Sequence, residues 1–218
     1  MWHCHRLTNR IETQQNGGGG MKTFRTMTYV LLMGVSMSAS LLPAPVAAVE
    51  VSGVRLDDRA RVAQTDLVLN GAGMRTKFVF KVYVAALYLQ EKKGTTADIL
   101  ALPGPKRVSL RLVRELSAEQ LVEALEEGIR DNTTQAERDG LKPKLAELEA
   151  IMAGVKQGKD GDLIAIDFIP GSGTQVSLND AVRGKPIAGD DFYRTLLRIW
   201  LGDNPVSKDL KKALLGQP

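Results

Sequence analysis

The sequence predicts an α+β fold in which a layer of helices covers one side of a mainly antiparallel sheet. Three observations lead to this class. Segments with strand patterns occupy both ends of residues 49–216, segments with helical spacing occupy the middle, and Lys106–Leu116 alternates apolar and polar residues as a half-buried strand does. No Pro/Ser-rich linker, long charge run or repeat divides this region, so we expect a single domain over residues 49–218.

Strand patterns come first along this region. Val51–Val54 and Thr65–Asn70 are predicted to be short strands, and Lys77–Leu89 a long one rich in β-branched and aromatic residues. Thr96–Leu102 is predicted to form a helical turn before the next strand. In that next strand, Lys106–Leu116, the two faces are Val108, Leu110 and Leu112 against Arg107, Ser109 and Arg111.

Helical patterns occupy the middle. Ser117-Ala118-Glu119-Gln120 fits a capping box at the start of a helix. An apolar stripe follows it at helical spacing, formed by Leu121, Val122, Leu125 and Ile129. A second helix is expected over Thr134–Gly154, with a break near Gly140–Pro143 and with its charged residues on a solvated face.

Two strands and two helices complete the domain. Asp162–Ile169 and Thr174–Leu178 are joined by a glycine-rich loop and predict a hairpin. Asp190–Leu201 has the pattern of an amphipathic helix. Ser207 is expected to cap a last short helix that runs through Leu215.

The first 48 residues have a different character. A short basic start, Met21–Arg25, precedes an apolar run from Tyr29 to Leu42, and Val46-Ala47-Ala48 supplies the small side chains that a signal peptidase reads. This pattern is typical of a secretory signal peptide over residues 21–48, and the run is shorter than the roughly 20 residues of a spanning helix. We expect cleavage near Ala48, a periplasmic or secreted protein, and no stable membrane span after cleavage. An uncleaved membrane anchor is the alternative.

Residues 1–20 precede this expected signal peptide. The run Gly17–Gly20 lies directly before Met21, and purine-rich glycine codons there would match a bacterial ribosome-binding site. Our hypothesis is that translation begins at Met21 and that residues 1–20 are an untranslated or disordered extension. A true start at Met1 is the alternative, and N-terminal sequencing of the precursor distinguishes the two.

Removal of residues 1–48 changes the chemistry of the chain. His3, Cys4 and His5 all lie there, so the mature chain has neither cysteine nor histidine. Thiol nucleophiles, imidazole bases, disulfides and histidine-based metal sites are thereby excluded, and we expect no cofactor and no metal. The removed part carries four basic residues and one acidic residue, so the net charge falls from +4 to about +1. No overall electrostatic case for nucleic-acid binding remains.

The segment with the most chemical content is Asn70–Leu89, in which a glycine-rich turn delivers Arg75 to the long strand pattern. In one regular strand from Arg75 to Leu89, alternate side chains share a face. One face is then an apolar core stripe of Phe78, Phe80, Val82, Val84, Ala86 and Tyr88. The other face combines a phenol with three cations, and its members are Arg75, Lys77, Val79, Lys81, Tyr83, Ala85 and Leu87.

A partly buried face of this kind favours an anion or an oxyanion. We expect Arg75 to bind a carboxylate in a bidentate manner, Tyr83 to donate a hydrogen bond to it, and Lys81 to add charge. Two alternatives are open. The face is exposed and its lysines are solvated, or a β-bulge after Gly73 breaks the alternation. The orientation of Lys77 and Lys81, into a cleft or into water, is open as well.

Two stretches resemble the chalcone isomerase family, in particular its secreted bacterial chalcone-isomerase-like branch. The first is Gly71-Ala72-Gly73-Met74-Arg75 followed by Lys77-Phe78-Val79-Phe80-Lys81-Val82-Tyr83-Val84-Ala85-Ala86-Leu87-Tyr88-Leu89. The second is Phe192–Leu201 followed by Gly202-Asp203-Asn204-Pro205-Val206-Ser207. With the strands, helices and hairpin in the expected order, the resemblance covers nearly all of residues 49–216.

The resemblance implies an open-faced β-sandwich, in which a large antiparallel sheet is backed by a layer of helices, with a ligand cleft between the two. Plant enzymes of the family cyclise a chalcone to a flavanone there without a cofactor. An arginine of the glycine-rich segment assists the phenolate nucleophile, and a threonine and a tyrosine polarise the carbonyl through water. Fatty-acid-binding relatives on the same fold hold a carboxylate with an arginine and a hydroxyl.

The family's residues carry over to this sequence in part. Arg75 matches the family's arginine, although its connection to the strand is shorter here. Tyr83 stands where the enzymes have their threonine. The catalytic tyrosine of the enzymes would fall near Gln120 and Leu121, and no tyrosine is there. This absence weakens the expectation of isomerase activity, whereas Arg75 and Tyr83 suit the binding of a carboxylate.

Three functions follow from the sequence. The first is a non-catalytic binder of an amphipathic or anionic small molecule, fatty-acid-like or phenolic, with Arg75, Tyr83 and Lys81 as ligand-binding residues. The second is a cofactor-independent isomerase or intramolecular lyase of chalcone type, with Arg75 and Tyr83 as its catalytic residues. The third is an envelope protein that binds a partner and whose cleft is vestigial. The ligand's identity and the oligomeric state stay open.

Overall fold

The computed structural model describes residues 48–217 with the exception of residue 156. The expectations for the N-terminal extension and the signal peptide therefore fall almost wholly outside the described residues. Within the described part, no helix is long and apolar enough to cross a membrane.

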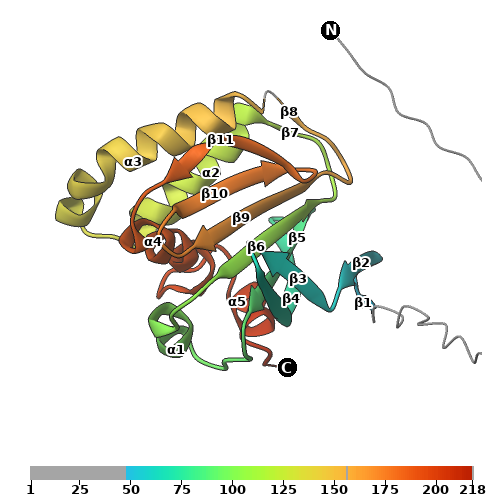
Figure 1. The fold of residues 1–218 in the computed structure, drawn as a ribbon. Helices are drawn as coiled ribbons and strands as arrows, with labels where there is room; N and C mark the ends of the chain where they lie inside the picture. Colours follow the sequence, from blue (N-terminus) through green and yellow to red (C-terminus); the bar gives the residue numbers. More distant parts are fainter. Residues whose placement is uncertain (1–47, 156, 218) are drawn as a thin grey trace, which may run out of the picture. The chain divides into compact units, whose positions relative to one another are not determined.

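A seven-stranded antiparallel sheet forms the centre of the fold (Figure 1). Its strands are β3 (Arg59–Val62), β4 (Thr65–Lys77), β5 (Phe80–Leu89), β6 (Lys106–Leu112), β9 (Leu163–Ile169), β10 (Gly173–Leu178) and β11 (Ala181–Ile187). They lie side by side in the order β11-β10-β9-β6-β5-β4-β3, and every neighbouring pair is antiparallel. The predicted antiparallel sheet is confirmed.

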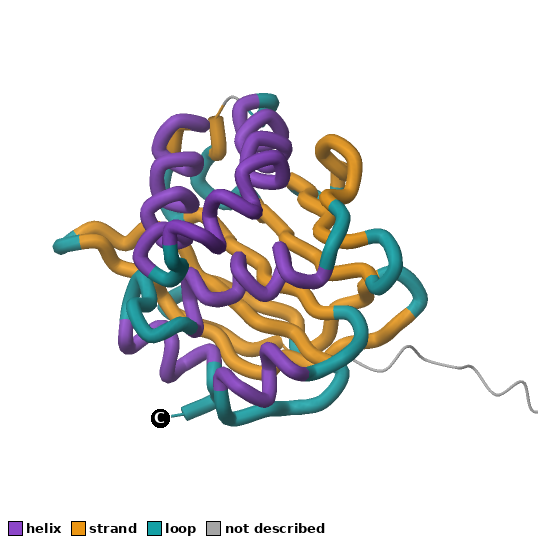
Figure 2. The backbone as a smooth tube through the Cα atoms, turned by 90° about the vertical axis from the view of Figure 1, so that its left-hand side faces the viewer, coloured by secondary structure: helices purple, strands orange, loops and turns teal. Residues whose placement is uncertain are grey.

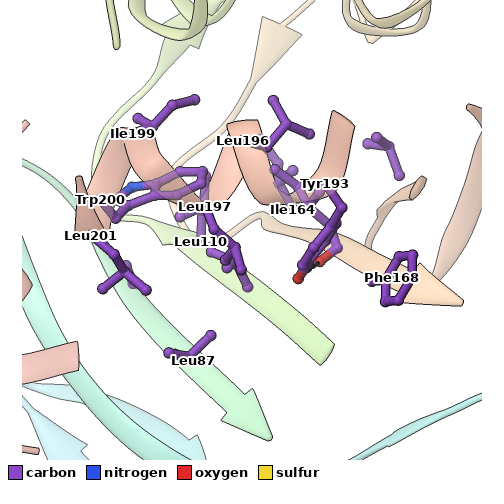
Figure 3. Close-up of a cluster of buried hydrophobic side chains, with 14 of the residues drawn as sticks. Leu87, Leu110, Ile164, Phe168, Tyr193, Leu196, Leu197, Ile199, Trp200 and Leu201 are labelled. Atoms are coloured by element: carbon purple, nitrogen blue, oxygen red, sulfur yellow. Dashed lines mark hydrogen bonds between the residues drawn. The ribbon is translucent and has the colours of Figure 1, made fainter. Parts of the chain in front are cut away.

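The helices lie on one face of this sheet, in front of the strands in Figure 2. They are α1 (Thr96–Ala101), α2 (Ala118–Asp131), α3 (Gln135–Ala153), α4 (Asp190–Leu201) and α5 (Lys208–Leu214). The larger core lies between them and the sheet, and α4 supplies much of it through Phe192, Tyr193, Leu196, Leu197, Ile199, Trp200 and Leu201 (Figure 3). The predicted α+β layer architecture is thereby confirmed.

The other face of the sheet carries a smaller apolar cluster made of strand residues alone, which includes Leu67, Leu69, Val84, Ala86 and Tyr88. A hairpin of β1 (Ala48–Val51) and β2 (Val54–Asp57) adds Leu56 to this cluster. The sheet is therefore covered by helices on one side and only partly covered on the other.

Both predicted helix starts are confirmed. Ser117 and Gln120 form the expected capping box of α2, and Thr134 and Glu137 form a second one at the start of α3. The predicted break near Gly140–Pro143 is wrong, since α3 runs through Pro143. Proline removes only one hydrogen-bond donor and disturbs one turn, and the buried residues of α3 hold the helix on both sides of it: Leu141, Leu148 and Met152.

Three strand predictions need correction. The predicted strand Val51–Val54 contains a turn, because Ser52 and Gly53 have positive φ and join β1 to β2. The strand predicted over Lys106–Leu116 ends at Leu112, and a short β7 (Leu116–Ser117) pairs with β8 (Gln157–Gly158). The third correction bears on the site, because Lys77–Leu89 is not one strand. The chain reverses at Phe78-Val79, between β4 and β5.

Candidate functional site

Arg75 and Tyr83 face each other across two neighbouring strands. The hairpin of β4 and β5 pairs Arg75 with Tyr83, and the guanidinium carbon of Arg75 lies 5.9 Å from the centre of the Tyr83 ring. The sequence predicted these residues on one face of a single strand. The structure brings them together by a different route, because a hairpin places directly paired residues on the same face.

A β-bulge at Asn70 turns Arg75 toward the helices. Leu67 and Leu69 contribute to the cluster on the far face, whereas Gly71 and Gly73 contact α5 on the helical face. The Asn70 side chain holds this bulge: its amide donates to the carbonyl oxygens of Leu214 at 2.7 Å and Lys93 at 3.0 Å, and its oxygen accepts from the Lys93 amide at 2.7 Å. The bulge considered after Gly73 does occur, between Arg75 and Thr76, but the irregularity at Asn70 precedes it and is the one that reverses the alternation before Arg75.

The glycines of this segment make room for a helix and do not form a turn. A Cβ on Gly71 would overlap the carbonyl oxygen of Ala213, and a Cβ on Gly73 would lie 2.8 Å from the Cβ of Ala213. Both positions lie inside β4, so the prediction of a glycine-rich turn is wrong. The close approach of α5 explains why glycine stands there.

The phenol of Tyr83 is fixed from the helical layer. Trp200 of α4 donates its indole N–H to the Tyr83 hydroxyl at 2.9 Å, and both side chains are buried (Trp200 is labelled in Figure 3). Burial raises the pKa of Tyr83, while the Arg75 charge and the Trp200 hydrogen bond act in the opposite direction. The phenol is therefore neutral at ordinary pH. Because its oxygen accepts from Trp200, its own O–H is able to donate to a further acceptor.

A cavity of about 200 Å³ lies between the β4–β5 hairpin and α2. Its wall is mainly apolar, and it is lined by Arg75, Lys77, Phe78, Phe80, Val82, Tyr83, Arg114, Leu116, Gln120, Leu121, Glu123 and Ala124. A narrower apolar extension of about 40 Å³ continues toward α3 and α4, where Met152, Ile164, Ile199 and Trp200 line it together with Arg75 and Tyr83. The cation and the phenol thus lie where the cavity meets its apolar extension.

Arg75 is only 8 % exposed, and within the described residues no carboxylate forms an ion pair with it. It also borders a more polar cavity of about 310 Å³, which Glu127, Asp131 and Asn204 help to line. Glu127 lies 3.6 Å from the ammonium group of Lys77. Glu127 and Asp131 thus line the polar cavity and are each paired with another cation, Lys77 and Arg130, whereas Glu123 lines the apolar cavity.

The other cations of this region differ in whether they line a cavity. Lys77 lines both cavities, whereas Lys81 is exposed, pairs with Thr76 and does not line the apolar cavity. Its predicted role in ligand binding has no geometric support there. Arg114 was not singled out from the sequence. It lines the cavity with its guanidinium carbon 5.3 Å from the centre of the Phe80 ring.

Gln120 and Leu121 belong to α2 and line the cavity. The position at which the resemblance places the catalytic tyrosine of the enzymes therefore does border this site. Neither residue is an acid able to protonate an enolate. Among the described residues, no group of three or more His, Cys, Asp or Glu side chains is placed to hold a metal ion. The chemistry on offer is an unpaired guanidinium and a neutral phenol beside an apolar space.

Comparison with known proteins gives two findings. A family model described as chalcone isomerase-like matches residues 48–216. A solved structure of a fatty-acid-binding protein from Arabidopsis thaliana has a similar fold, with a TM-score of 0.60 and 14 % identity, covering 78 % of this chain and 96 % of that chain. At this identity the structural likeness bears on the fold alone. No sequence among curated proteins matches this chain.

Proposed function

Because this chain belongs to the chalcone isomerase-like family, we propose that it is a non-catalytic protein that binds an amphipathic small molecule with an anionic head group, such as a fatty acid or a phenolic acid. Arg75 binds the head group, and the cavity under α2 holds the apolar part. The Arabidopsis protein of similar fold is a fatty-acid-binding protein, which agrees with this class of ligand.

The observation that carries the proposal is the buried guanidinium of Arg75 without a carboxylate partner. A buried charge costs several kcal/mol of solvation free energy unless an opposite charge or hydrogen bonds compensate it. A ligand carboxylate compensates it through two parallel N–H···O bonds, which is the geometry that arginine favours. An anionic head group therefore completes a site that the protein alone leaves incomplete.

Tyr83 and the apolar extension define the rest of the ligand. The Tyr83 hydroxyl, held by Trp200, lies beside Arg75 and donates a further hydrogen bond to the same head group. The extension lined by Met152, Ile164 and Ile199 accepts only apolar groups. A fully polar anion such as phosphate gains nothing from that space, so the geometry favours a molecule with a separate apolar part.

An isomerase of chalcone type is less well supported by the same cavity. That chemistry needs acidic donors at the position where negative charge develops on the carbonyl oxygen. Tyr83 is one such donor, but Gln120 and Leu121 occupy the place where the resemblance puts the second. Cyclisation of a chalcone is therefore the alternative outcome of the test below.

Native mass spectrometry of the protein purified from its host tests the proposal. We expect a co-purified lipid or aromatic acid. Arg75→Met should weaken the binding of that ligand roughly 10- to 100-fold, the range for loss of hydrogen bonds to a charged group. Tyr83→Phe should weaken it less, by about tenfold at most. The matched control is Lys81→Met, which removes an exposed cation of the same hairpin and should leave binding unchanged.

Arg75→Met also separates a binding defect from a folding defect. It replaces a buried unpaired charge by an apolar side chain of similar length, so the ligand-free variant should be at least as stable as the parent. Unchanged binding in both Arg75→Met and Tyr83→Phe would contradict the site. Cyclisation of a chalcone above the uncatalysed rate would replace binding by catalysis as the function.

The location of the protein in the cell is part of the proposal. We infer a periplasmic or secreted protein of the bacterial branch, from which the signal peptide is removed near Ala48. The family match begins at residue 48, next to the expected cleavage point, which supports this inference. Osmotic shock followed by intact-mass measurement tests it. We expect the protein in the periplasmic fraction with the mass of a chain that starts near residue 49. Protein that stays in the cytoplasm and keeps residues 21–48 would contradict the inference.

A further inference from the structure

The tip of the β4–β5 hairpin exposes three consecutive large apolar side chains. Phe78 is 89 % exposed, Val79 83 % and Phe80 59 %. In the described part of the chain only two other large apolar residues are exposed, Val49 and Val182, and they lie apart from each other in the sequence. The tip is therefore a concentrated apolar feature on a surface that is otherwise well covered.

The conformation of the tip is unfavourable for its sequence. Phe78 and Val79 form the loop between paired Lys77 and Phe80, and Phe78 has φ +57°. Left-handed backbone at a loop of this length favours glycine, asparagine or aspartate, and a bulky aromatic residue there is an outlier. Folding alone gives no reason for phenylalanine at this position, since neither its backbone conformation nor its packing favours it.

The tip also has a defined chemical surrounding. Phe78 and Phe80 line the apolar cavity, and Arg114 lies over the Phe80 ring. Lys77 and Lys81 flank the three apolar residues in the sequence. Glu127 pairs with Lys77, whereas neither Lys81 nor Arg114 forms an ion pair within the described part of the chain.

We propose that this tip docks on a lipid surface that contains anionic lipids. Phe78, Val79 and Phe80 enter the interfacial layer, and Lys81 and Arg114 face the anionic head groups. Because Phe78 and Phe80 also line the cavity, docking brings the cavity to the membrane. The inference goes beyond the proposed function, since it names a surface on which the protein acts whatever its ligand is.

The size of the tip favours a lipid surface over a protein partner. Stable protein interfaces bury roughly 1,200 Å² or more in total, with some 20 residues on each side, and three adjacent side chains supply a small part of that. An interfacial layer accepts a few aromatic side chains of any arrangement, and anionic lipids attract each nearby cation. Aromatic residues flanked by cations therefore match the lipid interface.

A tryptophan at the tip tests the inference directly. The emission of Phe78→Trp, after subtraction of the parent's emission, should shift to shorter wavelength when vesicles of phosphatidylcholine and phosphatidylglycerol are added. Vesicles of phosphatidylcholine alone should give a smaller shift, and salt should reduce it. This readout is local to the tip, so any contact made by residues 1–47 does not produce it.

A second variant tests binding without loss of folding. Phe78→Asn removes the aromatic ring at a position where asparagine suits the backbone better, so its thermal midpoint should be unchanged or higher. Its partition onto the mixed vesicles should fall about tenfold or more, as expected for an aromatic side chain that is no longer buried. The matched control is Val182→Ser, an exposed apolar residue on β11, which should partition like the parent.

Three results would overturn the inference. The first is that the emission wavelength of the Phe78→Trp variant does not change when vesicles are added. The second is that Phe78→Asn partitions onto the mixed vesicles as strongly as the parent. The third is an emission shift that occurs without vesicles and grows with protein concentration, together with a dimer in analytical ultracentrifugation. That result would mean that the tip binds a second copy of this chain. Ligand loss in Arg75→Met is a separate readout, so failure of the two proposals is distinguishable.

Discussion

Two arginines of this sheet, one partly buried and one buried, differ in their partners. Arg107 of β6 faces Asp167 of β9 in direct register and donates to both carboxylate oxygens at 2.6 Å. Its pKa is raised, mainly by these hydrogen bonds. Arg75 has the same side chain and is more deeply buried than Arg107, but no carboxylate stands across from it. The fold thus neutralises one arginine within the sheet and leaves the other without a carboxylate partner among the described residues.

Lys106 is a second buried cation, and its burial is unfavourable for the charged form. It is 3 % exposed, its ammonium group donates to the Gly104 carbonyl oxygen at 3.2 Å, and it lies 5.0 Å from the centre of the Phe168 ring. Its pKa is lowered to about 8, mainly by burial and also by the nearby Arg194 charge, while Asp190 acts in the opposite direction. The charged form is therefore less stable in the folded state than in the unfolded chain.

We predict that Lys106→Met stabilises the protein near neutral pH. Below pH 8 both states of the parent carry the proton, so the parent bears the whole cost of the buried charge. Between about 8 and 10.5 the unfolded state binds more protons than the folded one, so the parent's stability rises with pH. Urea unfolding should show the variant about 1–2 kcal/mol more stable at neutral pH, after allowance for solvent screening, and this advantage should shrink toward pH 10.

The control in this experiment is the comparison of the stability difference between variant and parent at neutral pH with the same difference near pH 10. Loss of the contact with Gly104 or of packing against Phe168 would shift the variant equally at every pH. Parallel stability curves for parent and variant would therefore contradict a lowered pKa at Lys106. A variant less stable than the parent at neutral pH would show that the contacts of the ammonium group outweigh its desolvation.

At the scale of elements, the packing of α5 on β4 sets the position of Arg75. Gly71 and Gly73 let the helix backbone approach the strand, and Asn70 ties the same bulge to the Leu214 carbonyl oxygen. Arg75 follows directly on the same face. A strand that α5 did not hold would leave the register of the bulge, and with it the direction of Arg75, less firmly defined.

Gly71→Ala should be strongly destabilising for this reason. The new methyl group would overlap the Ala213 carbonyl oxygen, which is backbone and cannot rotate away. We expect a loss of about 2 kcal/mol or more in the free energy of unfolding, although alanine in a strand gains up to about 1 kcal/mol over glycine. Ligand affinity should fall as well, because α5 must shift away from the strand.

Gly94→Ala is the matched control, since nothing lies within 4 Å of a Cβ at that position. It should change stability by about 0.5 kcal/mol or less, as at an open surface site. A parent-like unfolding midpoint for Gly71→Ala would mean that α5 does not lie on β4 in solution.

Elements with strong local signals could be predicted from the sequence. The capping box at Ser117 and the amphipathic pattern of Asp190–Leu201 each specify a helix by contacts within a few residues. β11 was missed because Val182-Arg183-Gly184-Lys185-Pro186 contains a glycine and a proline and has no clear alternation. As an edge strand it tolerates both residues.

The closeness of Arg75 and Tyr83 could be predicted from the sequence, because side chains alternate between the two faces of a strand. Arg75 and Tyr83 are eight residues apart, an even spacing that puts them on one face of a single strand. In the structure a two-residue loop and a bulge between Arg75 and Thr76 restore the same proximity across a hairpin. Without a glycine, asparagine or aspartate at Phe78-Val79, the sequence gives no turn signal. Nor does any local pattern bring Arg114 to Phe80, since that contact depends on tertiary packing.

At the scale of the whole molecule, helices and sheet share one apolar core. The larger cluster joins Leu87 of β5, Leu110 of β6 and Ile164 of β9 to Leu196 and Trp200 of α4 (Figure 3). Trp200 is also bonded to Tyr83 in the sheet. Neither layer can separate from the other without exposing this core to water, so we expect them to unfold together.

Leu196→Ala in a Trp2→Phe background tests this cooperativity, because Trp200 is then the only tryptophan. Leu196 is 1 % exposed, so its truncation should cost about 2–5 kcal/mol. Trp200 fluorescence, which reports the contact between layers, and far-ultraviolet circular dichroism, which reports both layers, should give the same urea midpoint before and after the change. Val182→Ser on exposed β11 should move that midpoint little. If the helical layer were a separate cooperative unit, the two signals would have different midpoints and Leu196→Ala would widen the gap between them. A single shifted transition instead means that the cavity walls, supplied by β4, β5 and α2, persist only while the whole core is intact, so that ligand binding should stabilise every element at once.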